Sequence, residues 1–462
     1  MTGLDAANVL IADWALLPGG WARDVRLELD AGGSIIAATP NRSHDRATRI
    51  VGAVLPGMPN AHSHAFQRCF AGRTEHARAK SDDFWTWREV MYRAAAAMDP
   101  ESLHDIALYV FSRMLEAGYT SVAEFHYLHR ARGGEAYTPE DAMARSVVEA
   151  ARRAGIGLTL LPVLYDRGGF EDEPLSPPQR RFHMPLDRIL ASIEAGSANG
   201  VLWLRWGLAP HSLRAVVPEG LGETIDALRK IDPDAPIHLH IAEQKAEVDA
   251  FRAAYGQSPI AWLLENLPVE PSWCLVHCTH ARPEELRAVA QTGAVVAVCP
   301  TTEANLGDGL FDLATFVDAG GRFAIGSDSN VAIDPFEELR LLEYGQRLAL
   351  RRRNILAGHS GSALWLAAAA AGAQALGRKA GLLAAGYSAD MVVIRPSAEV
   401  ERDDPDFWLD SAIFAALEQP VRDVMARGRW VVRDGRHAQS VTIGEQYRKA
   451  LADLRRRGSI DA

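Results

Sequence analysis

Eight apolar, strand-like runs that alternate with Ala- and Leu-rich helical stretches constrain the fold of this chain most strongly. Most of the runs are continuously apolar, which is typical of strands buried on both faces of a parallel sheet. Their alternation with helices indicates repeated βαβ units. We therefore predict an α/β fold, a (β/α)8 TIM-like barrel, with an open doubly wound sheet as the alternative. The runs cover residues 53–64, 119–127, 156–165, 201–210, 236–243, 273–278, 293–300 and 322–328.

The two ends of the chain differ from its middle. Residues 1–55 contain short strands separated by glycine-rich turns, and strand-like runs return after Gly386. We predict that both ends form a small β-sandwich domain beside the barrel. Residues 1–55 are its first part, residues 56–380 the barrel, and residues 381–462 its second part with a C-terminal helix.

Charge and hydropathy exclude some classes of partner. The formal net charge is −10 and no basic stripe is visible, which disfavours a nucleic-acid partner. No uncharged apolar run approaches the length of about 18 residues that a membrane span needs. The first residues do not resemble a signal peptide, so we expect a cytoplasmic protein with free thiols. Its four cysteines are Cys69, Cys274, Cys278 and Cys299, and the Cys274/Cys278 pair lacks the second pair that a zinc site needs.

Histidine and aspartate side chains gather at strand ends. His62 and His64 are two residues apart on one strand, so both imidazoles share a face. His240, His277 and Asp328 end other strands, and barrel strand ends converge on the mouth where active sites lie. We predict a metal site from His62, His64, His240 and Asp328.

Two choices remain within this site. His238 shares a face with His240, but His240 is nearer the strand's C-terminal end and is followed by Glu243, so we favour His240. None of the five lysines ends the third or fourth strand, which favours one metal ion over two. Zinc is the expected divalent ion, although such a site also accepts iron and manganese.

The runs LPGMPNAHSHAFQR, HIAE, WCLVH, CPTTEANLGDG and GSDSN together resemble the amidohydrolase superfamily. Within it the chain is similar, over almost its whole length, to the formiminoglutamate deiminases of histidine degradation. The resemblance implies a hydrolase that acts on a C–N bond of a linear amidine. The expected reaction converts N-formimino-L-glutamate and water to N-formyl-L-glutamate and ammonia. It also implies a homodimer.

The resemblance further implies roles for individual residues. Metal-activated water attacks the formimino carbon, and Glu243, His277 and Asp328 transfer protons. The small anionic substrate is expected to contact Gln67, Arg88, Tyr127, His211 and Arg214. Two arginines suit its two carboxylates, because guanidinium groups bind carboxylates in a bidentate manner.

Two other functions remain as alternatives. A purine- or pyrimidine-type deaminase of the same superfamily needs aromatic stacking, which Phe66, Trp85 and Trp87 could supply. A metal- or ligand-binding protein without turnover is the lesser alternative, and it has no need of Glu243 beside a metal ligand.

Overall fold

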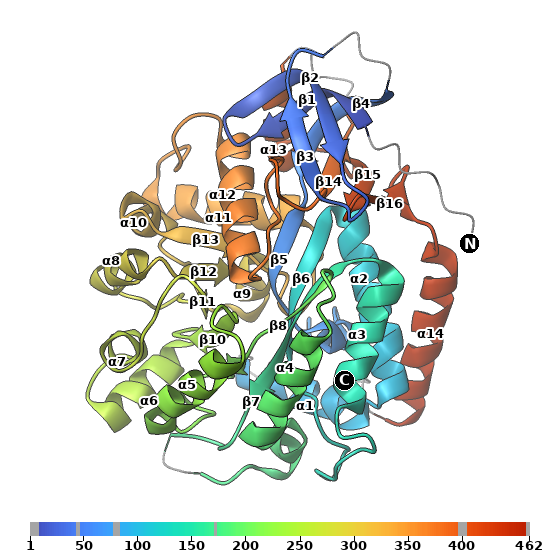
Figure 1. Ribbon diagram of the computed structural model, residues 1–462. Helices are drawn as coiled ribbons and strands as arrows, with labels where there is room; N and C mark the ends of the chain where they lie inside the picture. Colours follow the sequence, from blue (N-terminus) through green and yellow to red (C-terminus); the bar gives the residue numbers. More distant parts are fainter. Residues whose placement is uncertain (1–8, 43–46, 77–83, 171–172, 396–403, 459–462) are drawn as a thin grey trace.

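A closed barrel of parallel strands forms the centre of the protein. The computed structural model describes residues 9–42, 47–76, 84–170, 173–395 and 404–458. Each of the eight predicted runs contains at least one barrel strand, and the α/β barrel class is confirmed (Figure 1). The strands are β5 (Met58–Ser63), β6 (Tyr119–His126), β7 (Gly157–Leu164), β8 (Leu204–Trp206), β9 (Ala209–Pro210), β10 (Ile237–Ile241), β11 (Trp273–His277), β12 (Val295–Val298) and β13 (Arg322–Ile325).

Two parallel sheets close the barrel. One sheet has the order β5-β6-β7-β8, with β9 paired to β7, and the other has the order β10-β11-β12-β13. They meet at two seams, where isolated parallel bridges pair Leu208 with Ile237 and Ser212 with His240 on one side and Ser63 with Asp328 on the other. The strands therefore surround one core, and the open doubly wound alternative is excluded.

Two predicted runs are interrupted at glycines. Run 53–64 divides at Gly57, where the chain leaves the terminal sheet and enters β5; a Cβ atom there would lie 2.4 Å from the Thr120 hydroxyl oxygen. Run 201–210 divides at Gly207, where a Cβ atom would lie 2.4 Å from the Pro236 carbonyl oxygen. In both places the backbone approaches its neighbour too closely for any side chain.

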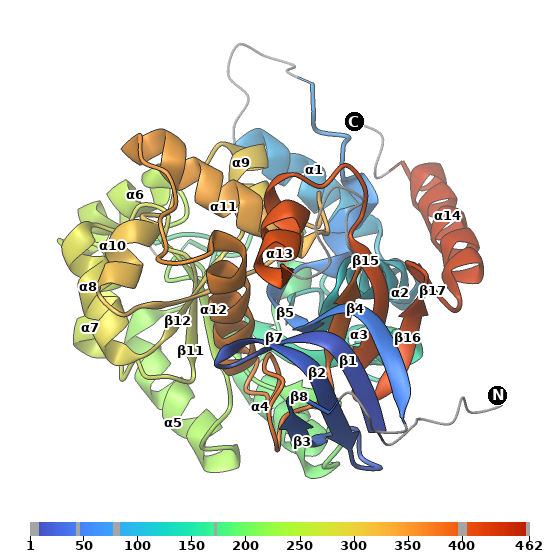
Figure 2. The same cartoon turned by 90° about the horizontal axis from the view of Figure 1, so that it is seen from above.

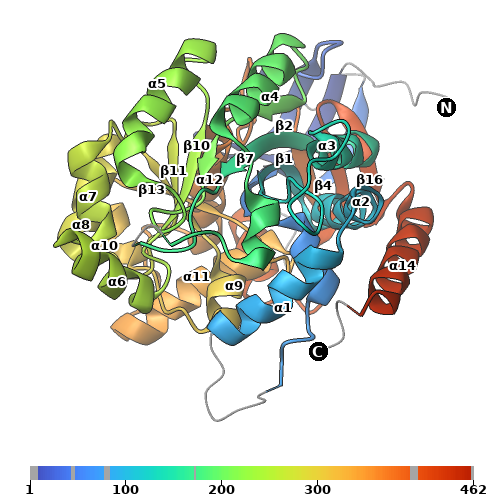
Figure 3. The same cartoon turned by 90° about the horizontal axis from the view of Figure 1, so that it is seen from below.

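Helices surround the barrel, and Figure 3 shows α5, α7, α8 and α10 outside β10, β11 and β13. Capping residues fix the two ends of α2. The Asp99 side chain accepts a hydrogen bond from the Ser102 N–H at 2.9 Å at its start, and Gly118 ends the helix at φ 107°. Within the described ranges, no helix combines the length and apolarity needed to cross a bilayer. The helices are α1 (Phe84–Ala97), α2 (Pro100–Ala117), α3 (Ala142–Ala154), α4 (Leu186–Ala198), α5 (Leu221–Ile231), α6 (Lys245–Tyr255), α7 (Pro259–Asn266), α8 (Pro283–Thr292), α9 (Pro300–Leu306), α10 (Leu313–Asp318), α11 (Pro335–Leu350), α12 (Ser360–Ala375), α13 (Pro405–Phe414) and α14 (Ser440–Arg456), with short 3-10 turns at η1 (Ala65–Phe70), η2 (Pro177–Phe182) and η3 (Pro218–Gly220).

The predicted association of the two ends of the chain in a separate β-structure is confirmed, and its strands form one eight-stranded sheet (Figure 1). Its order is β17-β16-β15-β14-β4-β1-β2-β3, and the pairing of Met391 in β14 with Pro56 in β4 joins the C-terminal strands to the N-terminal ones. Helix α14 lies against α2, where the rings of Tyr109 and Tyr447 stack at 3.9 Å (Figure 2). The strands of this sheet are β1 (Val9–Leu17), β2 (Gly20–Leu29), β3 (Ile35–Thr39), β4 (Thr48–Pro56), β14 (Met391–Ile394), β15 (Val421–Ala426), β16 (Arg429–Arg433) and β17 (Arg436–His437).

Candidate active site

Three buried imidazoles meet at the carboxyl ends of the barrel strands. His62 lies in β5, His64 follows the end of that strand, and His240 lies in β10. The Nε2 atom of His62 is 3.1 Å from Nε2 of His64 and 3.0 Å from Nε2 of His240. The two-residue spacing in β5 places its two imidazoles on one face, and barrel closure brings the third from the other sheet.

Backbone carbonyls fix the tautomers of two of these rings. Nδ1 of His64 donates to the Phe125 carbonyl oxygen at 3.0 Å, and Nδ1 of His240 donates to the His211 carbonyl oxygen at 3.0 Å. Burial, with the nearby His62, lowers the pKa of His64 to about 3, so its ring is neutral. Both rings therefore turn Nε2 lone pairs toward His62.

Asp328 adds a carboxylate to the three imidazoles. Its Oδ1 atom lies 3.5 Å from Nε2 of His62 and 3.4 Å from Nε2 of His64. The residue follows β13 at φ 43°, a left-handed conformation that aspartate tolerates. Burial disfavours the carboxylate charge, but the hydrogen bond with His62 and the surrounding histidines lower the pKa of Asp328 below its usual value.

This group fits a divalent cation. Two ligand atoms held about 2.0–2.2 Å from one ion lie about 3.0–3.5 Å apart, and the distances from His62 to His64, His240 and Asp328, and from His64 to Asp328, lie in this range. Without a cation or a proton between them, three buried lone pairs would face one another, which is unfavourable. Nδ1 of His62 also has no hydrogen-bond partner among the described residues. Three imidazoles with one carboxylate are a ligand set typical of zinc and related ions.

His238 does not belong to this group. Its Nε2 atom donates to the Ala375 carbonyl oxygen at 2.8 Å, deeper in the barrel. Of the cysteines, all four are free and buried. Only Cys299 lies in a possible ligand group within the described residues, with His277 and Asp328, and burial raises the pKa of its thiol well above the usual value.

Glu243 and His277 lie beside the imidazole group. Nε2 of His277 is 3.9 Å from Oε1 of Glu243 and 3.8 Å from Oδ2 of Asp328. Burial raises the pKa of Glu243 to about 8, against the opposing charge of His277. Burial alone would lower the pKa of His277, but the adjacent carboxylates, Glu243 first, raise it to about 10. The two groups titrate as a coupled pair, because the charge of Glu243 raises the pKa of His277 and the charge of His277 lowers that of Glu243, so the pair holds a transferable proton next to the metal-type cluster.

Sequence reasoning missed the residue that holds His277 in place. Oε1 of Glu303, in the first turn of α9, accepts a hydrogen bond from Nδ1 of His277 at 3.1 Å and the Cys299 N–H at 2.9 Å. This contact leaves Nε2 of His277 facing the pocket. Glu303 lies within the CPTTEANLGDG motif, but its position on a helix gave no spacing signal that connects it with His277.

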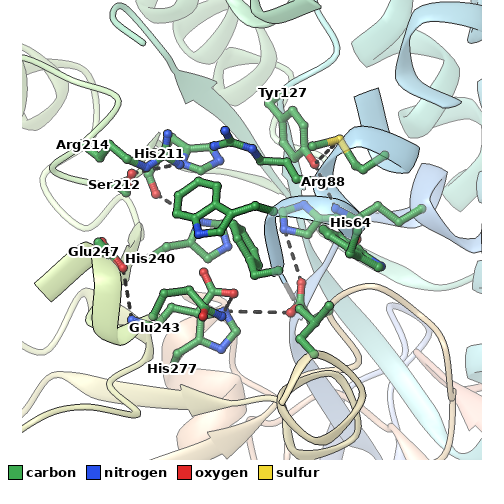
Figure 4. A pocket seen from close by; sticks show the side chains of 18 of the residues that line it. His64, Arg88, Tyr127, His211, Ser212, Arg214, His240, Glu243, Glu247 and His277 are labelled. Carbon is green, nitrogen blue, oxygen red and sulfur yellow. Dashed lines mark hydrogen bonds and ion pairs between the residues drawn. The ribbon is translucent and has the colours of Figure 1, made fainter. Parts of the chain in front are cut away.

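The five expected substrate residues line the same pocket as His64, His240, Glu243, His277 and Asp328 (Figure 4). Among the described residues, Nε of Arg88 and Nη1 of Arg214 are buried without a hydrogen-bond partner. The pocket thus holds a metal-type cluster at one end and guanidinium donors at the other. These five residues are Gln67, Arg88, Tyr127, His211 and Arg214.

Contacts within the pocket orient several of these side chains. Nε2 of Gln67 donates to the Tyr127 hydroxyl oxygen at 2.9 Å. The guanidinium carbon of Arg88 lies 4.3 Å from the centre of the Trp85 ring, a cation–π contact. Trp85 and Trp87 line the pocket, whereas Phe66 is buried beside Tyr127 with ring centroids 5.3 Å apart.

Family comparisons match almost the whole chain. The model described as the amidohydrolase family matches residues 53–431. The model described as the N-terminal domain of formimidoylglutamate deiminase HutF matches residues 7–49. A formimidoylglutamate deiminase from Pseudomonas aeruginosa is 46% identical over 97% of this chain and 99% of its own length. A 5-methylthioadenosine/S-adenosylhomocysteine deaminase from Halobacterium salinarum is 27% identical, over 89% of this chain and 88% of its own length.

Solved structures agree with this match. An amidohydrolase from Brucella melitensis has a TM-score of 0.91 and 42% identity, and the match covers 97% of this chain and 99% of that one. An adenosine deaminase from Xanthomonas campestris with bound zinc has a TM-score of 0.79 at 22% identity, over 97% of this chain and 98% of that one. At this identity the second likeness supports the barrel fold only.

Proposed function

Because this chain belongs to the amidohydrolase family, we propose that it is a formimidoylglutamate deiminase. It hydrolyses a C–N bond of N-formimino-L-glutamate and releases N-formyl-L-glutamate and ammonia, a reaction of histidine degradation. The observation that carries this proposal is the two-ended pocket. Proton-transfer residues and a cation-binding cluster lie in the same cavity as two arginines with unpaired buried N–H groups.

Members of the amidohydrolase family are metal-dependent, and this chain has a matching His/Asp group. We assign one divalent ion, zinc, to His62, His64, His240 and Asp328. When bound, such an ion lowers the pKa of water to near 7 and makes a nucleophile available at neutral pH.

The side chains around the ligand group supply the proton transfers. The Asp328 carboxylate accepts a proton from the attacking water. Glu243, whose pKa burial raises to about 8, delivers a proton to the departing amino group, which leaves as ammonia, and takes up the proton that the hydroxyl group loses when the formyl carbonyl forms. A neutral His277 could act as a base, but its raised pKa and its contact with Glu303 favour a protonated ring. We therefore assign His277 the donation of a hydrogen bond from Nε2 to the tetrahedral intermediate.

The other end of the pocket recognises the two carboxylates of the substrate. Arg88 and Arg214 supply charged donors, and His211 and Tyr127 supply further hydrogen bonds. Gln67 holds the Tyr127 hydroxyl in place. A planar base offers nothing that needs two guanidinium groups, so the pocket favours a dicarboxylate over the purine or pyrimidine alternative. The homodimer that the resemblance implies stays a prediction.

Ammonia release from N-formimino-L-glutamate tests the proposal. The purified protein is assayed as isolated, after chelation and after zinc is restored, next to Arg88→Met, Arg214→Met and the control Arg145→Met, whose side chain is 69% exposed. We expect metal-dependent release that falls at least about 100-fold in the two pocket variants and stays unchanged in the control. Release of ammonia from aminated heterocycles but not from formiminoglutamate would overturn the proposal.

A further inference from the structure

Glu247 is an acidic pocket residue that the proposed reaction does not use. It lies in the first turn of α6 and lines the pocket together with Glu243 and Arg214. Its Oε2 atom accepts the Glu243 N–H at 3.2 Å (Figure 4). The residue therefore contacts the backbone of the proton-transfer residue without being part of the proton transfer itself.

Burial raises the pKa of Glu247 above its usual value. Arg214, followed by the backbone N–H groups of Gln244 and Glu243, favours the ionised form and partly offsets this effect. The first turn of a helix also favours negative charge, because unpaired backbone N–H groups point outward there. A carboxylate has about four acceptor sites, so these two backbone donors leave capacity for a ligand.

The position of Glu247 corresponds to one part of the substrate. Figure 4 shows Glu247 between Arg214 and Glu243 along one wall of the pocket. If Arg214 binds the α-carboxylate and Glu243 lies beside the reacting carbon, the substrate nitrogen between the α-carbon and the formimino carbon lies next to Glu247. In the substrate this nitrogen carries an N–H that belongs to the amidine.

Charge separates the substrate from its product at this point. Amidines are strong bases, so the formimino group is a delocalised cation at neutral pH, whereas the formyl group of the product is an uncharged amide. The two carboxylates are identical in both molecules, and Arg88 and Arg214 alone do not distinguish them. Resting on the proposed function, we propose that Glu247 determines specificity by binding the internal N–H of the cationic amidine, which favours the substrate over the product.

Glu247→Gln tests this assignment, because it keeps an oxygen for the Glu243 N–H and removes the negative charge. The KM of N-formimino-L-glutamate and the competitive Ki of N-formyl-L-glutamate are measured for the zinc-loaded native and variant proteins. Asp249→Asn is the matched control, since it removes the same charge from the same helix at a side chain that is 59% exposed.

In Glu247→Gln we expect the ratio of product Ki to substrate KM to fall at least about tenfold, as the loss of one charge-assisted hydrogen bond predicts. The KM rises, whereas the Ki stays constant or falls because the carboxylates lose a repulsive neighbour. The ratio in Asp249→Asn stays native. Parallel changes of KM and Ki, or no change in either, would overturn the proposal and leave Glu247 a structural support.

Two further results keep the outcomes distinct. Glu247→Asp retains the charge but places it one methylene farther from the substrate, so the ratio of product Ki to substrate KM should fall about threefold. This variant tests the proposal even if the Gln variant does not fold. An unchanged ratio in Glu247→Asp contradicts the proposal. Native protein that does not turn over formiminoglutamate refutes the proposed function and this inference together. Native turnover with an unchanged ratio in the Gln variant refutes only the role of Glu247.

Discussion

Replacing Glu303 by Gln removes a negative charge from beside His277 and keeps an oxygen that accepts hydrogen bonds. Oε1 of Glu303 lies 3.1 Å from Nδ1 of His277. Two unit charges about 4 Å apart interact by about 4 kcal/mol at an effective dielectric constant of about 20, which equals about three pKa units. The pKa of His277 is raised to about 10 in the native protein. We therefore expect it to fall to about 7 in Glu303→Gln.

The lower pKa of His277 in Glu303→Gln should make kcat fall at a lower pH than in the native enzyme. A raised pKa keeps the Nε2 donor of His277 protonated until the pH rises through that pKa, so the native enzyme retains the donor at about pH 8.5 and the variant loses it. The ratio of native to variant kcat should increase about 30-fold between about pH 6 and about pH 8.5. Ammonia release at saturating substrate measures the ratio. Glu284→Gln, at a side chain that is 62% exposed, is the control.

Using this ratio cancels titrations that both proteins share, namely those of groups outside the coupled pair of Glu243 and His277. A ratio that stays constant across the pH range would refute the electrostatic link between Glu303 and His277. A decrease in kcat that is equal at all pH values would instead show that Glu303 only maintains the position of the ring.

Three further predictions concern stability. Burial lowers the pKa of His129 to about 4, and its Nε2 donates to the Val163 carbonyl oxygen at 3.0 Å. The neutral ring of His129 stabilises the fold above the unfolded pKa of about 6.5, and this contribution is lost as the pH falls toward 4. The free energy of unfolding in urea should therefore fall about 2 kcal/mol less between pH 7 and pH 5 in His129→Gln than in the native protein. Equal decreases in the two proteins contradict this. Chelation should lower the Tm by at least about 5 °C, reversibly with zinc, and an unchanged calorimetric Tm contradicts cation binding by the His62 group. Gly207→Ala should lower the free energy of unfolding by about 1–3 kcal/mol, because its Cβ would lie too close to Pro236. Gly222→Ala in α5, where no atom lies within 4 Å of the added Cβ, should not lower it. Equal changes in the two variants refute the close approach at Gly207.

Strand content and the positions of the strand-borne residues could be predicted because they depend on local periodicity. His62 and His64 follow from the two-residue repeat of a strand, and Asp328 follows from the rule that barrel sites lie at carboxyl ends. The interruptions at Gly57 and Gly207 could not be predicted, because their cause is a close approach of chain segments that are distant in sequence.

Residues on helices were the main omission from the candidate site. Glu303 and Glu247 each lie in the first turn of a helix that follows a barrel strand. Whether such a side chain turns back into the pocket depends on how the loop after the strand bends. In the loop from β10 to α6, which carries Glu247, Ala242 has a φ of 52°, a conformation that no spacing rule indicates.

The two seams of the barrel give the ligand group a mechanical consequence. His62 and His64 belong to the sheet that begins with β5, whereas His240 and Asp328 belong to the sheet from β10 to β13. Isolated backbone bridges join these sheets, Ser63 with Asp328 at one seam and Leu208 with Ile237 and Ser212 with His240 at the other. A cation held by these four side chains would cross-link the two sheets of the barrel. The free energy of metal binding would then include the free energy needed to hold the two sheets together. A substitution that weakens the pairing at either seam should therefore lower the affinity for the metal, even though no ligand is replaced.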